Sequence, residues 1–253
     1  MKKIILLNKK EGETPFLALQ NFRAKYKAYK DAKITYVGRL DPLVSGLLLL
    51  LVGDKIKEKE TYQGLSKEYK FEILFGFTTD THDILGKVTQ MASLDLVVNS
   101  KSELQKKIKQ NLKFFTGKFQ QKYPMYSSKT VLGKALFTYA RRGVKIKQPE
   151  HEVEIKSLEF LKLKKINARK FLENIERRIK KVKGDFRQKE ILKIWRDQLE
   201  KSKESFLVAS FYVKCGPGMY VRSVANDLGE KLKIPALAFS IKRTKIGQWS
   251  KIA

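Results

Sequence analysis

Asp41 is the side chain with the clearest capacity for chemistry, because it stands in a short loop, Arg39-Leu40-Asp41-Pro42. A carboxylate is ionised at neutral pH, so it can attack an electrophilic carbon without an activating base. Pro42 makes the loop rigid, and Leu40 can anchor it in the core. A Leu-Asp-Pro loop is also typical of aspartates that cap helices or form turns. From the loop alone, Asp41 is either a nucleophile or a turn residue.

The segments around this loop have the patterns of buried secondary structure. Residues 33–37 predict a short strand, and Leu47–Val52 predict a buried strand or a short buried helix, which periodicity does not distinguish. Polar and apolar residues alternate over 68–75, so this segment, which contains Tyr69, is predicted to be a half-buried strand. The remaining predicted elements are strands at 3–8, 206–214 and 242–247, and helices at 15–29, 101–114, 133–142 and 221–232.

Residues 164–203 differ from the rest of the chain, with 15 Lys and Arg against 6 Asp and Glu, a net charge of +9. Apolar residues at helical spacing on both sides of Gly184 predict an antiparallel pair of helices. This pair is either a functional basic insertion or a solvated excursion without a specific role. The whole pattern predicts an α+β fold, with a mixed, largely antiparallel central sheet flanked by helices and an inserted helical hairpin.

The composition is strongly basic, with 54 Lys and Arg against 26 Asp and Glu and a net charge of +28. This excess favours nucleic acid as the partner, although a generally Lys-rich proteome is an alternative and charge does not separate RNA from DNA or membrane. The single Cys215 and two histidines exclude a disulfide framework and a cysteine-cluster metal site, so no metal is expected. The apolar runs are too short for a signal peptide or a membrane span, so we expect a cytoplasmic protein.

Five blocks of the chain resemble, in order, the motifs of one enzyme family. The blocks are residues 8–14 (Lys-Pro-x-Gly-x-Thr in the family), 38–48 (Gly-x-Leu-Asp-Pro-x-x-Ser/Thr-Gly-x-Leu), 66–86 (a tyrosine-bearing strand, then Thr-Asp-Thr-x-Asp-x-x-Gly), 124–141 (Pro-Met-Tyr-Ser-Ala) and 215–229 (Cys-x-x-Gly-Thr-Tyr-Ile-Arg). Together they span nearly the whole chain apart from residues 164–203. The chain therefore resembles the TruB type of tRNA pseudouridine synthase.

This resemblance implies the pseudouridine synthase catalytic fold and the isomerisation of uridine to pseudouridine, with no cofactor. Asp41 would attack C1′ of the ribose or act through a glycal route. Arg222 would orient Asp41 through its guanidinium group. Tyr69 would stack under the flipped base, which is worth roughly 1–3 kcal/mol, and help to deprotonate C5. The plain structural alternatives are a surface arginine at a helix start and a core tyrosine.

The resemblance also assigns the rest of the substrate pocket. Tyr220 and Ile241 match the remaining pocket positions, and Tyr36 stands where the family has the histidine that fills the space of the flipped base. The implied substrate is the T-loop of tRNA, at uridine 55. We expect a monomer with one catalytic domain over residues 1–253 and no C-terminal PUA domain. Residues 164–203 are expected to replace part of the phosphate contact of that domain.

Two alternative functions stay open. Arg39-Leu40-Asp41 also resembles the Arg-Leu-Asp loop of the RsuA and RluA branches, and this resemblance would indicate a ribosomal RNA pseudouridine synthase. The short stretch before Asp41 leaves no room for the S4-type RNA-binding domain usual in those branches. The other alternative is a non-catalytic tRNA-binding chaperone, and the intact Asp41, Tyr69 and Arg222 argue against it.

Overall fold

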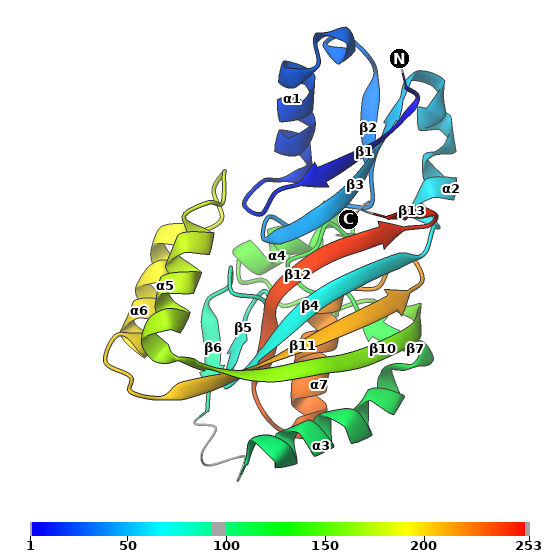
Figure 1. Cartoon of the computed structure of the whole chain (residues 1–253). Helices are drawn as coiled ribbons and strands as arrows, with labels where there is room; N and C mark the ends of the chain where they lie inside the picture. Colours follow the sequence, from blue (N-terminus) through cyan, green and yellow to red (C-terminus); the bar gives the residue numbers. More distant parts are fainter. Residues whose placement is uncertain (1, 93–99, 251–253) are drawn as a thin grey trace.

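A computed structural model of the chain describes residues 2–92 and 100–250. Its centre is a nine-stranded sheet in the order β1-β3-β12-β4-β11-β10-β7, with β2 added to β3 and β13 to β12 (Figure 1). The strands of this sheet are β1 Ile4–Lys9, β2 Ile34–Val37, β3 Val44–Val52, β4 Lys67–Phe75, β7 Gly117–Lys122, β10 Glu150–Asn167, β11 Ser205–Cys215, β12 Ala236–Ile246 and β13 Trp249–Ser250. Two small hairpins lie beside it, β5 Phe77–Thr79 with β6 Val88–Met91, and β8 Thr130–Val131 with β9 Lys134–Ala135.

The strand pairing in the main sheet is antiparallel except between β12 and β3, where Ile241 pairs in parallel with Val44 and Arg243 with Gly46. The expected mixed, largely antiparallel sheet is therefore confirmed. The apolar run that periodicity left undecided is part of β3, and Leu48 to Leu51 are fully buried. A strand buried on both faces has no polar alternation, which explains why its pattern resembled that of a buried helix.

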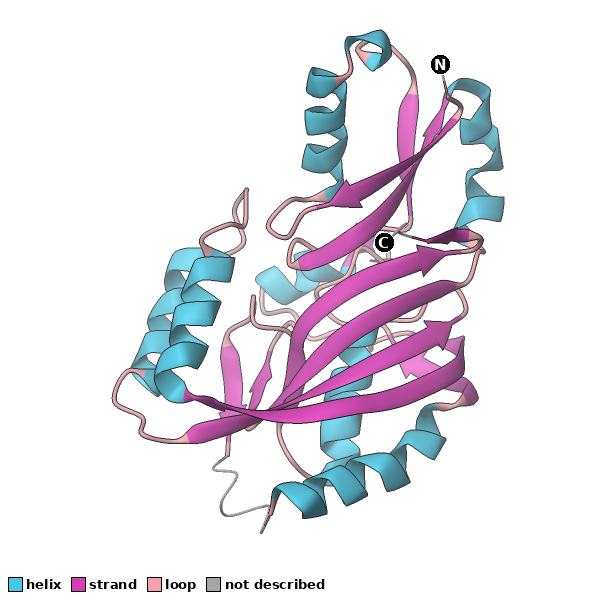
Figure 2. Cartoon of the chain, viewed as in Figure 1, coloured by secondary structure: helices cyan, strands magenta, loops and turns pink. Residues whose placement is uncertain are grey.

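Helices cover the sheet from both faces (Figures 1 and 2). They are α1 Pro15–Lys25, α2 Lys59–Gln63, α3 Lys101–Asn111, α4 Leu136–Arg141, α5 Ala168–Ile179, α6 Gln188–Leu199 and α7 Val221–Leu232. The main core lies between one face of β4 and β11 and the helices α3 and α7, and it includes Phe71, Leu104 and Val224. In the described part of the chain, no helix is both long and apolar enough to cross a membrane.

The expected helical pair is α5 and α6, and it packs on the opposite face of the sheet at one end. Phe171, Ile175 and Trp195 are fully buried there against Val208 of β11. The pair is therefore part of a second core rather than a solvated excursion. Its connection contains Gly184 at φ +97°, a backbone conformation that favours glycine.

The boundaries of several predicted elements need correction. Residues 164–167 belong to the end of β10, because this Lys-rich stretch continues the antiparallel pairing with β11 as far as Asn167 and Ser205. The predicted helix 15–29 ends at Lys25, and a short 3-10 turn follows at Lys27–Tyr29. The predicted helix 101–114 ends at Asn111 in the same way, with a 3-10 turn at Leu112–Phe115. Only the second half of segment 133–142 is helical, since its first residues form β9.

Candidate active site

The loop between β2 and β3 holds Asp41 at the surface of the cleft. Gly38 opens the loop at φ +66°, and Leu40, 5% exposed, anchors it in the main core. The carbonyl of Asp41 accepts a hydrogen bond of 3.0 Å from the amide of Val44, which closes the turn into β3. The Asp41 side chain keeps 40% of its surface exposed, so its carboxylate is available to a substrate.

A buried lysine supports the loop from below. Lys9 is 1% exposed, and its Nζ donates to the carbonyls of Glu13 (2.6 Å), Lys10 (3.1 Å) and Pro42 (3.2 Å). Burial lowers the pKa of Lys9 to about 8, although the nearby carboxylates of Glu13 and Asp41 act in the opposite direction. The amide of Gly12 also donates to the carbonyl of Pro42, at 2.9 Å. The N-terminal segment therefore fixes the position of the residue that follows Asp41.

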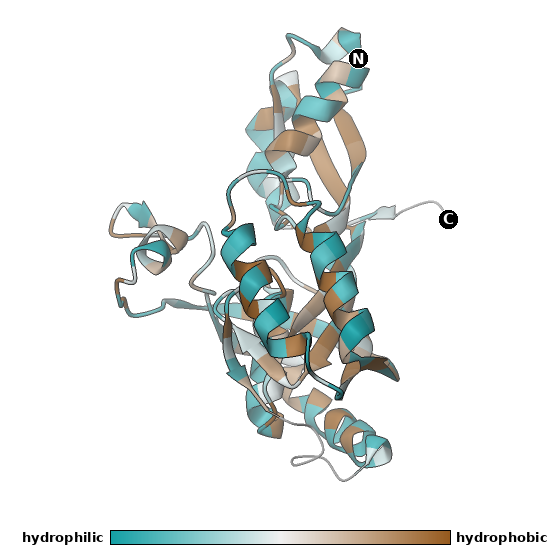
Figure 3. Cartoon of the chain, turned by 90° about the vertical axis from the view of Figure 1, so that its left-hand side faces the viewer, coloured by the Kyte–Doolittle hydropathy of each residue, from teal (hydrophilic) through white to brown (hydrophobic). Residues whose placement is uncertain are grey.

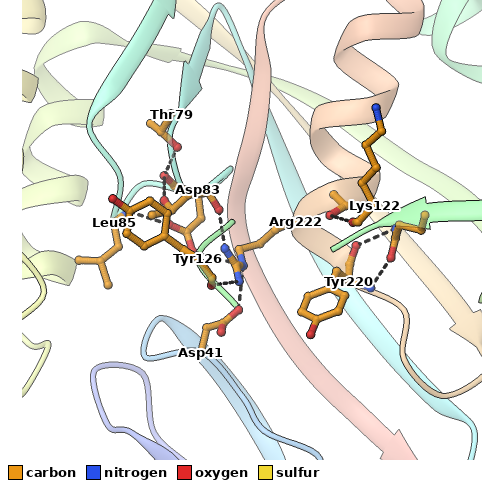
Figure 4. Close-up of polar contacts among 11 residues, drawn as sticks. Asp41, Thr79, Asp83, Leu85, Lys122, Tyr126, Tyr220 and Arg222 are labelled. Carbon is orange, nitrogen blue, oxygen red and sulfur yellow. Dashed lines mark hydrogen bonds and ion pairs between the residues drawn. The ribbon is translucent and has the colours of Figure 1, made fainter. Parts of the chain in front are cut away.

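Arg222 joins the loop to two other segments (Figure 4). It lies in the first turn of α7 with 3% of its side chain exposed, and its Nε donates to Oδ2 of Asp41 at 2.8 Å. Its Nη1 donates to the carbonyl of Thr81 at 2.5 Å and its Nη2 to the carbonyl of Tyr126 at 3.2 Å. Each guanidinium nitrogen has an acceptor, so Arg222 can hold Asp41 in only one orientation.

Asp83 is a second carboxylate on Arg222, and sequence reasoning gave it no role. Its Oδ2 lies 3.8 Å from Nε of Arg222, and its Oδ1 accepts from Thr81 Oγ1 (2.7 Å) and the Leu85 amide (2.9 Å). Burial raises the pKa of Asp83, and Arg222 opposes this shift. Burial would lower the pKa of Arg222, but Asp41 and Asp83 outweigh it and keep that pKa above its ordinary value. The acidic stretch at 80–86 was visible in the sequence, but its contact with α7 was not.

A cleft of about 1180 Å³ opens above this pair, larger than most small-molecule pockets. The structure brings all the predicted site residues to its lining, namely Tyr36, Asp41, Tyr69, Tyr220, Arg222 and Ile241. Arg39 also lines the cleft, and its side chain is exposed. Residues that are more than two hundred positions apart in the chain, Tyr36 and Ile241, thus line one cleft.

Tyr69 and Ile241 come from neighbouring strands, β4 and β12, and both are 8% exposed. Arg243 pairs with Tyr69 across these strands and is 1% exposed, with Nε donating to Leu47 (2.7 Å) and Nη2 to Gly38 (3.0 Å). Burial raises the pKa of the Tyr69 hydroxyl, and Arg243 counteracts this shift. Sequence reasoning missed Arg243, but strand alternation contained the signal, since residues two apart share a face. An Ile241 directed into the pocket implies that Arg243 is directed there too.

Aromatic rings contribute a further part of the cleft lining. Tyr220 is held by Gln121, which accepts from its amide at 2.8 Å and donates to its carbonyl at 3.3 Å. Tyr123 lies edge-on to Tyr220 at 5.8 Å between centroids and stacks on His151 at 3.9 Å. Tyr36, on β2, packs partly against the small core under α1 and reaches the cleft at its other side. These rings offer surfaces on which a planar base can stack.

Arg187, at the start of α6, is a further cleft residue that sequence reasoning missed. Its Nη1 and Nη2 donate to the two carboxylate oxygens of Asp80 at 2.7 and 3.3 Å. Its guanidinium also lies 4.5 Å from the ring centroid of Tyr126. Arg187 therefore holds together the segments of Asp80 and Tyr126. These two segments supply the carbonyls that accept hydrogen bonds from Arg222. Among the described residues, no cluster of His, Cys, Asp and Glu is arranged to hold a metal ion.

The sequence matches the family model described as TruB family pseudouridylate synthase (N terminal domain) over residues 25–186. The tRNA pseudouridine synthase B of Lactobacillus acidophilus is 32% identical over 240 residues, covering 95% of this chain and 67% of that protein. The protein of the same name in Ligilactobacillus salivarius is 33% identical over 247 residues, covering 98% of this chain and 68% of that protein.

Two solved structures share the fold. A chain of the Cbf5-Nop10-Gar1 complex gives a TM-score of 0.54 at 17% identity, and a chain of the H/ACA RNP bound to a substrate RNA containing 2'-deoxyuridine gives 0.53 at 17% identity. Each match covers 98% of this chain, which spans about half the length of those chains, 50% and 48%.

The fold and these similarities define the class of protein, a pseudouridine synthase and therefore an isomerase. Within this class, the chain belongs to the TruB family of pseudouridylate synthases. The family resemblance and the fold class expected from the sequence motifs are thus confirmed.

Proposed function

We propose that this enzyme converts uridine to pseudouridine in the T-loop of tRNA, at position 55, with Asp41 as the nucleophile. The observation that carries the proposal is the ion pair between the half-exposed Asp41 and the buried Arg222 beneath the cleft. The relatives named tRNA pseudouridine synthase B support tRNA as the substrate.

The reaction breaks one bond to C1′ and forms another, and its atoms balance without a cofactor. The Asp41 carboxylate attacks C1′, and the N1–C1′ bond breaks with its electron pair on the uracil. The uracil turns in the cleft, C5 attacks C1′, and Asp41 leaves as a carboxylate before a base takes the proton from C5 and N1 gains a proton. In the glycal route, Asp41 instead takes a proton from C2′ as the N1–C1′ bond breaks, and C2′ regains a proton when C5 attacks C1′. Both routes use the same placement of Asp41 relative to the ribose.

The second carboxylate has a clear electrostatic purpose in this scheme. When Asp41 forms an ester or takes a proton, it loses its negative charge, and Arg222 loses its nearer counter-ion. A buried guanidinium without a counter-ion would raise the energy of that state. Asp83, 3.8 Å from Nε of Arg222 and 8% exposed, would remain as the partner. It thereby reduces the cost of neutralising Asp41.

The uridine must leave its stack in the RNA before it can enter the cleft. Tyr69 would stack under the uracil, with Ile241 beside it and Tyr220 also in the cleft lining. The hydroxyl of Tyr69 lies beside Arg243, whose charge would favour the phenolate form of Tyr69 that takes the proton from C5. Tyr36 would fill the space that the flipped base leaves, and the exposed Arg39 would contact the opened RNA.

The test uses tRNA transcripts that contain only the four standard nucleosides. Pseudouridine is mapped by carbodiimide treatment and primer extension after incubation with wild type or Asp41→Asn. We expect a stop that marks the T-loop uridine with wild type and none with Asp41→Asn. Product with both proteins would refute the nucleophile assignment. Product only in a ribosomal RNA fragment would refute the tRNA assignment and favour the RsuA and RluA type of substrate.

A further inference from the structure

The positive charge of the helical pair is concentrated at one end. The turn that joins the helices, residues 177–189, contains seven Lys and Arg and one Asp, a net charge of +6. The parts of the pair on either side, residues 168–176 and 190–204, are each neutral. We call residues 177–189 the basic turn. Figure 3 looks onto the pair, whose ribbon is mainly hydrophilic on the side towards the viewer, while Phe171, Ile175 and Trp195 are buried in the second core.

Most of the charge in the basic turn is free to meet a ligand. Arg178 is buried against Glu11, and Arg187 is paired with Asp80, so these two residues fasten the turn to the protein. The other basic side chains are exposed, and in the described ranges four of them have no carboxylate partner. These four are Arg177, Lys181, Lys183 and Lys189.

The basic turn is directly connected to the loop that holds Asp41. The amide of Lys183 donates to the carbonyl of Gly12 at 3.0 Å, and the amide of Gly12 donates to the carbonyl of Pro42 at 2.9 Å. Gly12 has φ +94°, and a Cβ there would lie 2.4 Å from the carbonyl oxygen of Lys181, so only glycine permits this approach. Two backbone hydrogen bonds thus separate the turn from the residue next to the nucleophile.

The turn also reaches the rim of the cleft. Phe186 and Arg187 line it, and Arg141 at the end of α4 donates to the carbonyl of Asp185 at 3.2 Å. Residues 141–147 add four further basic residues and no acidic one. A uridine bound at Asp41 is joined on both sides to phosphates of the RNA backbone. That backbone must pass over the rim of the cleft. Exposed cations beside that rim match the charge of an RNA backbone.

We propose that the basic turn is a phosphate-binding surface that grips the RNA strand leading into the cleft. This inference rests on the proposed function, because it assumes that the polyanion is the RNA substrate. An anionic membrane is less compatible with the position of the turn, since a flat bilayer at the cleft rim would obstruct entry of the RNA. The contacts would be made to phosphates, so they would supply affinity and orientation rather than sequence recognition.

The test compares two triple variants of the full-length protein. The first changes the turn (Lys181→Gln, Lys183→Gln, Lys189→Gln), and the control changes exposed lysines at the far end of the pair (Lys170→Gln, Lys201→Gln, Lys203→Gln). The dissociation constant for an unmodified tRNA transcript is measured over a range of salt concentrations. Circular dichroism checks that both variants are folded, and binding to anionic phosphatidylserine vesicles is measured in parallel.

We expect the turn variant to bind tRNA roughly 10- to 100-fold more weakly at 0.15 M salt, with the salt slope reduced by roughly 2, because three phosphate contacts are lost. The control variant should match wild type. Equal effects of both variants, or none, would overturn the proposal, as would a loss of vesicle binding with unchanged tRNA affinity. Wild type that forms no pseudouridine in this tRNA would refute the proposed function, whereas the binding comparison would still decide the role of the basic turn.

Discussion

Nε of Arg222 lies 2.8 Å from Oδ2 of Asp41, although 181 positions separate the two residues in the chain. The contact crosses from α7 to the loop between β2 and β3, so it exists only when the whole sheet is assembled. The other two guanidinium nitrogens of Arg222 donate to backbone carbonyls, which do not titrate. In the proposed reaction Arg222 is therefore a fixed support, and Asp41 is the group that would change charge.

Arg222→Lys should nearly abolish pseudouridine formation although it keeps the positive charge. A lysine has one nitrogen where arginine has three, so it cannot serve Asp41, Thr81 and Tyr126 together. We expect a loss of about 100-fold or more in kcat and a fall of about 2 kcal/mol in the free energy of unfolding. Single-turnover assays and urea denaturation measure these effects. Arg169→Lys, at an exposed arginine, is the control, and normal activity of Arg222→Lys would contradict the support role.

Tyr69→Phe and Tyr69→Leu separate the two roles assigned to Tyr69. Phenylalanine keeps the stacking surface but lacks the hydroxyl beside Arg243. We expect Tyr69→Phe to bind tRNA like wild type and to lose most of its activity. Tyr69→Leu should also bind more weakly, by roughly 1–3 kcal/mol, the value of one stacked base. An active Tyr69→Phe enzyme would show that another group removes the proton from C5.

Arg187→Gln should lower activity about 10-fold, although Arg187 makes no contact with the carboxylate of Asp41. The change releases Asp80 and the ring of Tyr126, and these neighbours position the two carbonyls that hold Arg222. In a double-mutant cycle with Asp80→Asn, we expect a coupling of about 1 kcal/mol in the free energy of unfolding. Arg196→Gln, which breaks an exposed pair with Glu176 on the same helices, is the matched control. Additive effects of the Arg187 and Asp80 changes would contradict this role of Arg187.

Asp227 makes stability depend on pH. Burial raises its pKa to about 6 from an ordinary 3.8, so the folded state holds a proton that the unfolded state has already released between these values. The free energy of unfolding contributed by this group is complete below pH 4 and is lost as the pH rises through 6. Asp227→Asn should thus be more stable than wild type by up to about 3 kcal/mol at pH 7, with the gain shrinking towards pH 4. Urea denaturation across this range tests it, with exposed Asp197→Asn as the control, and a gain that is independent of pH would contradict the assignment.

The sequence predicted those parts of the molecule in which local pattern and tertiary environment agree. The helix at 221–232 has the expected bounds as α7, because its apolar spacing matches the face that it buries. The proposed site residues were predicted from motifs, and the structure brings them to the lining of one cleft. Neither the apolar spacing nor the motifs require knowledge of the strand order.

The sequence did not predict the cations that lie inside the protein. Lysine and arginine side chains are mostly exposed in proteins, so a sequence pattern predicts exposed positions for them. Lys9 and Arg243 are nevertheless only 1% exposed. Their burial is possible because carbonyls from remote segments accept their hydrogen bonds, Pro42 at 33 positions from Lys9 and Gly38 at 205 positions from Arg243. Such acceptors are set by the tertiary fold, so no local pattern reveals them.

The position of β12 between β3 and β4 has a consequence for how the protein is made. A ribosome releases the chain from its N-terminus, so β3 and β4 emerge long before β12, which starts at Ala236. Until then, no strand pairing joins the ribbon that carries Asp41 to the strand that carries Tyr69, and both present unpaired edges. The cleft residues of the two strands can therefore come together only late in synthesis, when β12 inserts between β3 and β4, and until then these open edges are available for wrong pairing.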